Sequence, residues 1–152
     1  MIVPISDAHI EAWLHLRRQL WPHCTDSEHR SEMDQFLGDA SRFAQFICLD
    51  EQGAPMGFAE ASIRSDHVNG TRSSPVAFLE GIFVEPRARQ SGIARGLVEV
   101  VSDWARGQGL SELASDADLS NTTSHAVHNA LGFEETERAV FFRMSLDGGR
   151  GT

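Results

Sequence analysis

The sequence predicts an α/β fold of the mixed (α+β) kind, in which helices cover both faces of one sheet. Two observations lead to this class. Strand-like and helix-like segments follow one another in the order β α α β β β α β α β, and the hydrophobic period changes from two to about 3.6 at Ser91. A chain of 152 residues without internal repeats or a linker fits one domain. We expect that domain to span residues 1–146, and residues 147–152 to form a flexible tail.

The N-terminal half carries start and stop signals for two helices. Apolar residues recur at helical spacing in the first of them until Pro22, which ends it. Thr25 and Glu28 stand in a capping-box arrangement at the start of the second, and Gly38 lies at its end. The segments expected in this half are a strand at 1–5, helices at 6–22 and 25–39, and strands at 42–50 and 56–65 joined by a hairpin turn.

The C-terminal half contains one strongly amphipathic helix. Ile93, Leu97, Val101 and Trp104 recur on one of its faces, and Asn121 is placed to cap a second helix. The segments expected here are a polar loop at 65–75, strands at 76–86 and 110–115, helices at 91–107 and 121–132, and a final strand pair or one bent strand at 133–146.

The overall charge argues against partners that are polyanions. The chain has 13 Lys and Arg against 22 Asp and Glu, a formal net charge of −9. Nucleic acid and anionic membrane surfaces repel such a protein, whereas a cationic substrate is attracted to it. The N-terminus has neither a basic start nor an apolar stretch of the length that a signal peptide or a membrane span requires. We therefore expect a cytoplasmic protein that binds neither nucleic acid nor membrane.

The two cysteines are too few to staple a fold. Cys48 lies in an apolar run and is expected to be a buried small hydrophobe. Cys24 follows His23, a pair of residue types that can bind metal. No second ligand cluster accompanies them, so we expect no metal site.

The segment "VEPRARQSGIARGL", residues 84–97, has the features of an anion-binding site. It joins the end of an apolar strand to a helix whose first turn contains Gly92. Unpaired amides and the dipole at a helix N-terminus attract an anion, and a glycine lets it approach the backbone. Arg87, Arg89 and Arg95 add positive charge for contacts with phosphates. The alternative is a solvated turn with three incidental arginines.

These residues resemble the GNAT N-acetyltransferases. "RQSGIA", residues 89–94, fits the family's Arg/Gln-x-x-Gly-x-Gly/Ala loop, which holds the pyrophosphate of acetyl-CoA. "N-x-x-S-x-x-x-H-x-x-L-G-F", from Asn121 to Phe133, is similar to the family's fourth helix entering its sixth strand. The resemblance runs from the first strand to about Leu146. It implies the GNAT fold, with a mixed, mostly antiparallel sheet of six to seven strands, helices on both faces and a splayed central strand pair.

The same resemblance implies acetyl-CoA as the acetyl donor, without a metal. The pantetheine arm of acetyl-CoA would enter between the splayed strands and pair with strand backbone. The residues that the resemblance assigns to acetyl-CoA are Ile82, Val84, Arg89, Gln90, Gly92, Ile93, Ala94, Arg95 and Asn121.

A narrower resemblance, to the aminoglycoside 6'-N-acetyltransferase branch, rests on four separated segments. They are "QLWP", "SSPVAFLEGIFV", "ELASD" and "ALGFEETER". The branch acetylates the 6'-amino group of cationic aminoglycoside antibiotics by direct attack of the amine on the thioester, which confers resistance. Its members are dimers, so a homodimer is expected. The apolar run "AVFFRMSL" would then serve either as a subunit interface or as a core strand.

Two carboxylates are candidates for the reacting centre, because the amine arrives as an ammonium and must lose a proton. Asp116 ends the strand "LSELASD", and the resemblance places it against the reacting amine as base or as electrostatic anchor. Its alternative is a turn aspartate like Asp118. Glu80 interrupts an apolar strand beside Gly81, where a bulge would splay this strand from the next. Its alternative is an edge carboxylate facing water.

A proton donor for the departing thiolate is harder to assign. Many GNAT enzymes use a tyrosine of the fourth helix, but this chain contains no tyrosine, and His128 stands at the matching position. An imidazole can donate a proton near neutral pH. The alternative is a helix-surface histidine without a role.

The pocket for a polycationic acceptor should contain carboxylates and an aromatic face. By resemblance the substrate-binding residues are Trp21, Asp66, His67, Glu80, Asp116 and Glu137. Two other readings stay open. One is a GNAT acetyltransferase for a polyamine, another small amine or a protein terminus. The other is a non-catalytic acyl-CoA-binding module, since a fold does not establish a function.

Overall fold

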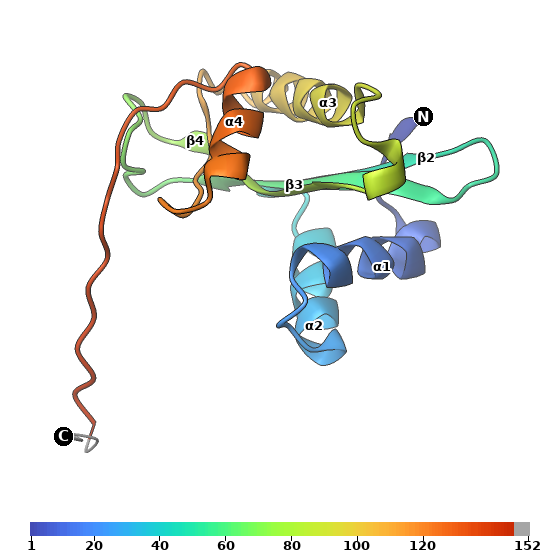
Figure 1. Ribbon diagram of the computed structural model, residues 1–152, viewed down its shortest axis with the longest axis horizontal. Coiled ribbons are helices and arrows are strands. Elements are labelled where there is room, and N and C mark those ends of the chain that lie inside the picture. The colour runs from blue at the N-terminus through green and yellow to red at the C-terminus, as the bar shows by residue number, and fades with distance from the viewer. Residues whose placement is uncertain (148–152) are drawn as a thin grey trace.

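A computed structural model describes residues 1–147, which form one five-stranded sheet between two layers of helices (Figure 1). Its strands are β1 (Ile2–Pro4), β2 (Phe43–Leu49), β3 (Pro55–Arg64), β4 (Val76–Val84) and β5 (Leu113–Ala114). Its helices are α1 (Ile10–Leu20), α2 (Asp26–Leu37), α3 (Ile93–Gly107) and α4 (Thr122–Ala130), with short 3-10 turns at Asp7–His9 and Pro86–Ala88. The predicted fold class and the positions of the helices are confirmed.

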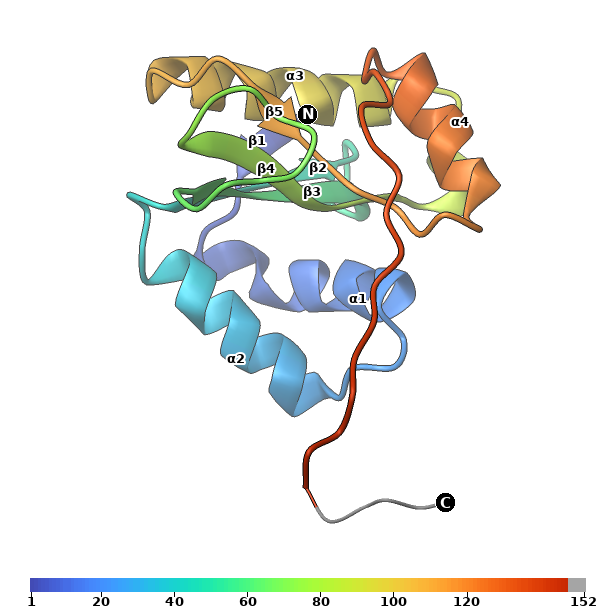
Figure 2. The same cartoon turned by 90° about the vertical axis from the view of Figure 1, so that its left-hand side faces the viewer.

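The sheet has the order β1-β2-β3-β4-β5. Neighbouring strands are antiparallel except β4 and β5, which are parallel. The α1–α2 pair covers one face of the sheet, and α3 and α4 lie over the other (Figures 1 and 2). Among the described residues, no helix is both long and apolar enough to cross a bilayer.

Local sequence signals explain where the helices begin. At the start of α2 the Thr25 hydroxyl accepts from the Glu28 amide at 3.1 Å, and the Glu28 carboxylate accepts from the Thr25 amide at 2.9 Å. These two bonds are the predicted capping box. At the start of α3, Gly92 is the N-cap with φ +86°, a left-handed conformation that glycine adopts without strain.

Two apolar clusters fill the space between the layers. On the α1–α2 face, Trp13, Leu14 and Phe58 are completely buried. On the α3 face, Ala59 of β3 packs with Leu97 of α3 and their apolar neighbours. Successive residues of β3 therefore serve opposite faces, as strand geometry requires.

β4 contains a bulge at the position where the sequence predicts one. Leu79 and Gly81 pair with the adjacent residues Ala61 and Glu60 of β3, so that Glu80 is an extra residue without a partner in the ladder. On its other side, β4 pairs with β5 through only two residue pairs, and Phe78 is the last residue of β4 in them. Beyond Phe78 the two strands are no longer paired, which is the splay that the resemblance implies.

The predicted strand or strand pair at 133–146 does not form. Residues 133–147, here called the C-terminal arm, have no strand assignment and run away from the sheet (Figure 1). Phe141 and Phe142 of the arm are 88% and 92% exposed. The prediction of six to seven strands is wrong, because a strand needs a neighbour for its backbone hydrogen bonds and the arm has none within residues 1–147. The predicted flexible tail lies outside the described residues, apart from Asp147.

Candidate active site

The turn between β4 and α3 forms an open cradle of backbone. Gln90 and Gly92 both have positive φ, 64° and 86°, which bends the chain sharply into α3. A Cβ added to Gly92 would meet no atom within 4 Å, so the space in front of this amide is open. The first amides of α3 have no partner within the helix, and the helix dipole adds positive potential. This geometry fits a phosphate-bearing ligand such as the pyrophosphate of CoA.

Two of the three arginines at the cradle hold backbone carbonyls. The Arg89 Nε donates to the Val84 carbonyl at 2.9 Å, and its guanidinium lies 5.6 Å from the centroid of the Phe83 ring. The Arg95 Nη2 donates to the carbonyl of Ala130 in α4 at 2.9 Å. Each guanidinium therefore uses one N–H group for a hydrogen bond within the protein, and its other N–H groups are available to an anion.

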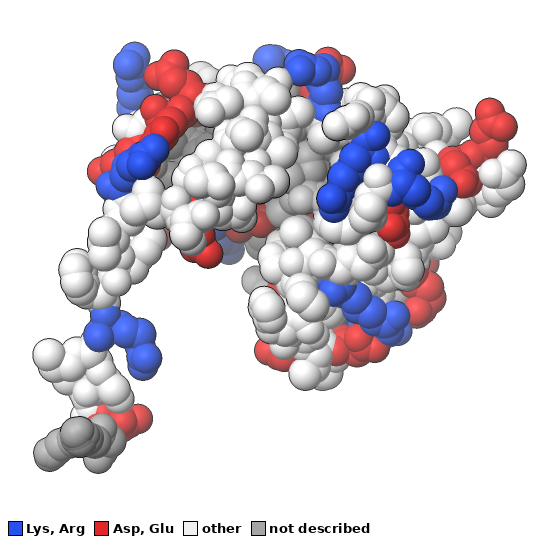
Figure 3. All heavy atoms as spheres, in the orientation of Figure 1, with Lys and Arg blue, Asp and Glu red and all other residues white. Residues whose placement is uncertain are grey.

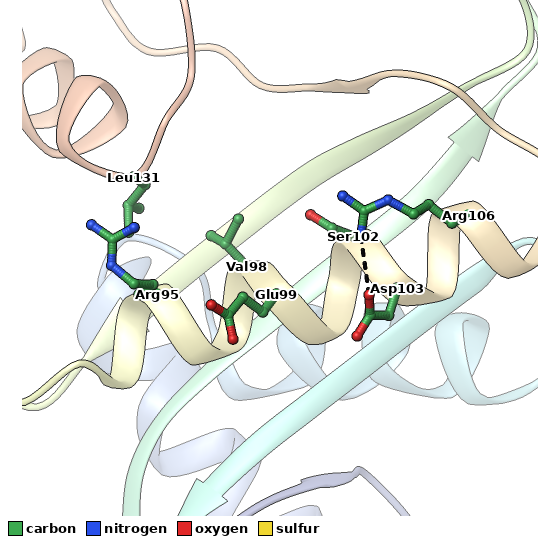
Figure 4. Close-up of a pocket in the computed structure, with 7 residues that line it drawn as sticks. All are labelled: Arg95, Val98, Glu99, Ser102, Asp103, Arg106 and Leu131. Atoms are coloured by element: carbon green, nitrogen blue, oxygen red, sulfur yellow. Dashed lines mark hydrogen bonds and ion pairs between the residues drawn. The ribbon is translucent and has the colours of Figure 1, made fainter.

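Arg95 also borders a groove on the outer side of α3 (Figure 4). Its lining includes the ion pair of Arg106 with Asp103 at 3.0 Å, and Leu131 at its edge. Neither Glu85, nor Gly92, nor the bulge of β4 lines this groove, so it is separate from the cradle and from the splay. The candidate active site is the region of the cradle and the splay, where the predicted site residues lie.

Glu80 is held in a defined position on the α1–α2 face. Its carboxylate accepts from the Ser62 hydroxyl at 2.7 Å and from two nitrogens of Arg64 at 2.9 and 3.1 Å. The Arg64 guanidinium in turn lies 3.5 Å from the centroid of the Phe78 ring. The Glu80 side chain is 26% exposed, so a ligand can reach it. Ser62 and Arg64 thus hold the carboxylate in one place, with part of its surface open to a ligand.

Asp116 follows the last residue of β5 by two positions, on the far side of the splay. It is exposed, and within residues 1–147 its carboxylate makes no hydrogen bond or ion pair. A carboxylate in this state is available to accept a proton or to hold an ammonium.

Both ring nitrogens of His128 take part in hydrogen bonds. Nδ1 lies 2.8 Å from the Ser124 carbonyl oxygen, and Nε2 lies 2.8 Å from the Ser115 hydroxyl. A carbonyl only accepts, so the neutral ring carries its proton on Nδ1 and accepts at Nε2 from Ser115. The Phe133 ring packs edge-on against the imidazole, with the two ring centroids 5.2 Å apart. His128 thus joins α4 to the end of β5, next to Asp116.

The other predicted acceptor residues come from three parts of the chain. Trp21 caps α1 and packs against Gly81 of the bulge, where an added Cβ would lie 2.5 Å from its ring. Asp66 and His67 are exposed in the loop after β3. Glu137 lies in the C-terminal arm beside Gly70 of the same loop, with its Cβ 3.7 Å from the position of a Cβ on Gly70.

The loop at 65–75 is tied to β5 by one carboxylate. Glu112 accepts from the amides of Arg72 and Ser73 at 2.9 and 2.7 Å, and also from the Ser73 hydroxyl. The hydroxyl and amide bonds hold the pKa of Glu112 below its usual range.

Figure 3 shows open space between the C-terminal arm and the α1–α2 pair, with acidic and basic side chains at its upper edge. Among the described residues, no group of three or more His, Cys, Asp or Glu side chains is placed to hold a metal ion.

Sequence reasoning missed several residues of this site. They are Ser62, Arg64, Glu112, Ser115 and the buried pair Arg17–Glu60. One signal was present: Glu60, Ser62 and Arg64 alternate along a strand and give its α1–α2 face a polar stripe.

The fold and the cradle define an acyl-CoA-dependent transferase of the GNAT class, and comparison with known proteins agrees. The profile of the acetyltransferase (GNAT) family matches residues 10–133. The chain belongs to this family.

Individual relatives resemble the chain over nearly its full length. Aminoglycoside N(6')-acetyltransferase type 1 of Serratia marcescens is 49% identical over 146 residues, which cover 96% of this chain and 99% of the relative. The protein of the same name from Acinetobacter baumannii is 51% identical over 145 residues, 95% and 98% of the two chains.

Solved structures of such enzymes superimpose closely. The aminoglycoside 6'-N-acetyltransferase AAC(6')-Ih from Acinetobacter baumannii has a TM-score of 0.91 at 49% identity, covering 96% of this chain and 98% of the other. AAC(6')-Iy, in complex with the bisubstrate analog CoA-S-monomethyl-acetylneamine, has a TM-score of 0.90 at 47% identity, covering 95% and 97%.

Proposed function

We propose that this protein transfers the acetyl group of acetyl-CoA to the 6'-amino group of aminoglycosides and thereby confers resistance to them. The observation that carries the proposal is the close match, at 47% identity and a TM-score of 0.90, to an enzyme solved with a CoA–aminoglycoside bisubstrate analog. The open cradle at Gly92 supports acetyl-CoA as one substrate, and the carboxylates of Glu80 and Asp116 beside the splay support a cationic second substrate.

The reaction needs the two substrates to meet at the splay between β4 and β5. The cradle, with Gln90, Arg89 and the first amides of α3, binds the pyrophosphate of acetyl-CoA, and Ile93, Ala94 and Asn121 line its approach. Backbone of β4 near Ile82 and Val84 pairs with the pantetheine arm. Amides of the same strand donate to the carbonyl oxygen of the thioester, where negative charge grows during attack.

The acceptor is held by carboxylates on both sides of the splay. Asp116 accepts the proton of the incoming ammonium, since its carboxylate has no other partner within residues 1–147. Glu80, fixed by Arg64, anchors a second positive group. Trp21 supplies the aromatic face of the pocket, and Asp66, His67 and Glu137 enclose its outer side.

The thiolate of CoA leaves with help from the Ser115–His128 pair. When His128 is protonated, its Nε2 donates to Ser115, and the Ser115 hydroxyl can then donate to the sulfur. The pKa of a thiol, about 8.5, means that this help is modest.

A homodimer that works in the cytoplasm completes the proposal. The support on the molecule is the C-terminal arm, where Val140, Phe141, Phe142, Met144 and Leu146 are all exposed in one extended segment. Contiguous exposed apolar surface is typical of a site that contacts another surface. A second copy of the chain, pairing its arm with this one, would cover it.

The experiment that tests the function is release of CoA thiol from acetyl-CoA with matched acceptors. Neomycin and paromomycin differ by an amine against a hydroxyl at the 6' position, so only neomycin should give 6'-acetylation, with the product located by mass spectrometry. Spermidine and a peptide amine serve as further acceptors. Turnover of spermidine or the peptide alone would favour the polyamine or small-amine reading. Cofactor binding without turnover of any acceptor would favour a non-catalytic acyl-CoA module.

A further inference from the structure

An arginine is completely buried beneath the bulge of β4. Arg17 of α1 is 0% exposed, and Glu60 of β3 is 1% exposed. One guanidinium nitrogen of Arg17 donates to Glu60 and another to Glu32, while Nε lies 3.2 Å from the Nδ1 of His29. The Trp13 indole donates to the same Glu60 oxygen at 2.7 Å. All three sides of the guanidinium are therefore engaged.

The guanidinium of Arg17 lies over the ring of Trp21. The Arg17 Cζ is 4.7 Å from the centroid of the Trp21 ring, within the range of a cation–π contact. The edge of the same ring lies against Gly81, where an added Cβ would be 2.5 and 2.6 Å from two ring carbons. Phe58 meets the ring edge-on at 6.1 Å. The indole is thus confined between Arg17, Phe58 and the bulge.

A buried ion pair is a poor way to stabilise a core, since apolar residues of equal volume do as well or better. Burial raises the pKa of Glu60 to about 7 against the opposing effect of Arg17, which shows how unfavourable a charge is at this place. The location of the pair suggests a different purpose. Glu60 is the ladder partner of Gly81, next to the extra residue Glu80.

We infer that Arg17, anchored by Glu60, is a positioning residue that fixes the indole of Trp21 against the bulge and so sets the distance between this aromatic wall and Glu80. The inference deepens the proposed function and rests on it, because the wall is one side of the pocket for the cationic sugar. It concerns the acceptor alone. The acetyl-CoA cradle lies at the far end of β4, beyond Val84.

The test removes the pair without leaving a buried charge. In Arg17→Met/Glu60→Gln both residues keep their approximate volume, and the protein should fold. We expect the KM for an aminoglycoside to rise about tenfold, with the KM for acetyl-CoA unchanged. Arg18→Met is the matched control, because Arg18 is the next residue of the same helix and pairs with Asp26 in solvent at 2.6 Å. It should change neither KM.

The decisive measurement is a double-mutant comparison with Trp21→Phe. If Arg17 acts through Trp21, the paired substitutions add little to the acceptor KM once Trp21 is replaced. A full additional tenfold effect in that background, or an equal rise in both KM values, would overturn the inference.

A second readout does not depend on activity. The Trp21 indole NH signal in a two-dimensional NMR spectrum, assigned from its loss in Trp21→Phe, should broaden or split in the paired variant and stay sharp in Arg18→Met. An unchanged signal in the paired variant would refute the positioning role even if the native enzyme acts on another amine. An inactive native enzyme with a changed signal would refute the proposed function and leave the confinement of Trp21 standing.

Discussion

Replacing Gly92 with alanine separates the strain of a turn from its role in binding acetyl-CoA. Gly92 has φ +86°, and an added Cβ would meet no protein atom within 4 Å. The left-handed conformation costs an alanine about 1–2 kcal/mol, partly offset by about 0.4–1 kcal/mol because alanine loses less chain entropy on folding. The net loss is about 1 kcal/mol, which lowers the Tm of a chain of this size by about 2–4 °C.

The effect on the cofactor should be larger than the effect on the fold. The Cβ would stand in the open space through which a phosphate approaches the amides, so we expect the Kd for acetyl-CoA to rise about tenfold, or about 1.4 kcal/mol. Calorimetric titration measures the Kd and a thermal melt the Tm. Gly109→Ala is the control, because Gly109 has φ +80° and equally open surroundings beyond the other end of α3. Equal Kd values for the two variants would refute the cradle.

Three further predictions concern the acceptor side. Asp116→Asn should lower kcat at least about 100-fold, the usual contribution of a general base, and leave the Kd for acetyl-CoA unchanged. Gly81→Ala should cost about 1–3 kcal/mol of stability, because the new Cβ would lie 2.5 Å from Trp21, and should raise the acceptor KM. Glu112→Gln should loosen the loop at Ser73. The pKa of Glu112 is lowered in the folded state, so its stabilising effect is present above pH 4.5, the ordinary pKa of the group, and disappears as the pH falls through the lowered value.

Each of these has a control in the chain and an outcome that contradicts it. Asp118→Asn should leave kcat near the native value, and a native-like kcat in Asp116→Asn would exclude that carboxylate as the base. Gly107→Ala has no atom within 4 Å of the new Cβ and should melt no lower than the native protein. A native Tm for Gly81→Ala would contradict the close contact. If the difference in Tm between Glu112→Gln and the native protein stays constant from pH 7 down to the lowest pH at which both are folded, the carboxylate does not hold the loop.

The features that the sequence predicted correctly depend on near neighbours in the chain. The capping box of Thr25 and Glu28 needs three residues, and the change of period at Ser91 needs about two helical turns. Gly92 was predicted to leave the backbone open in the first turn of a helix, and it lies at the N-cap of α3 with open space around it.

The features that were missed depend on residues far apart. Arg17 and Glu60 are 43 positions apart, and each alone reads as an ordinary surface charge. The prediction of a strand in the C-terminal arm was wrong for a related reason. Its alternation is that of a strand, but a strand forms only where a partner offers backbone hydrogen bonds, and no local pattern states where that partner is.

The bulge of β4 has a consequence for how such a site can arise. Leu79 and Gly81 already pair with the consecutive residues Ala61 and Glu60. Removing Glu80 would therefore leave a regular strand in which all the remaining residues keep their present face of the sheet. The sheet is complete without this glutamate. One inserted residue is therefore enough to convert a plain strand into one that presents a carboxylate to a ligand, without any change in the rest of the architecture.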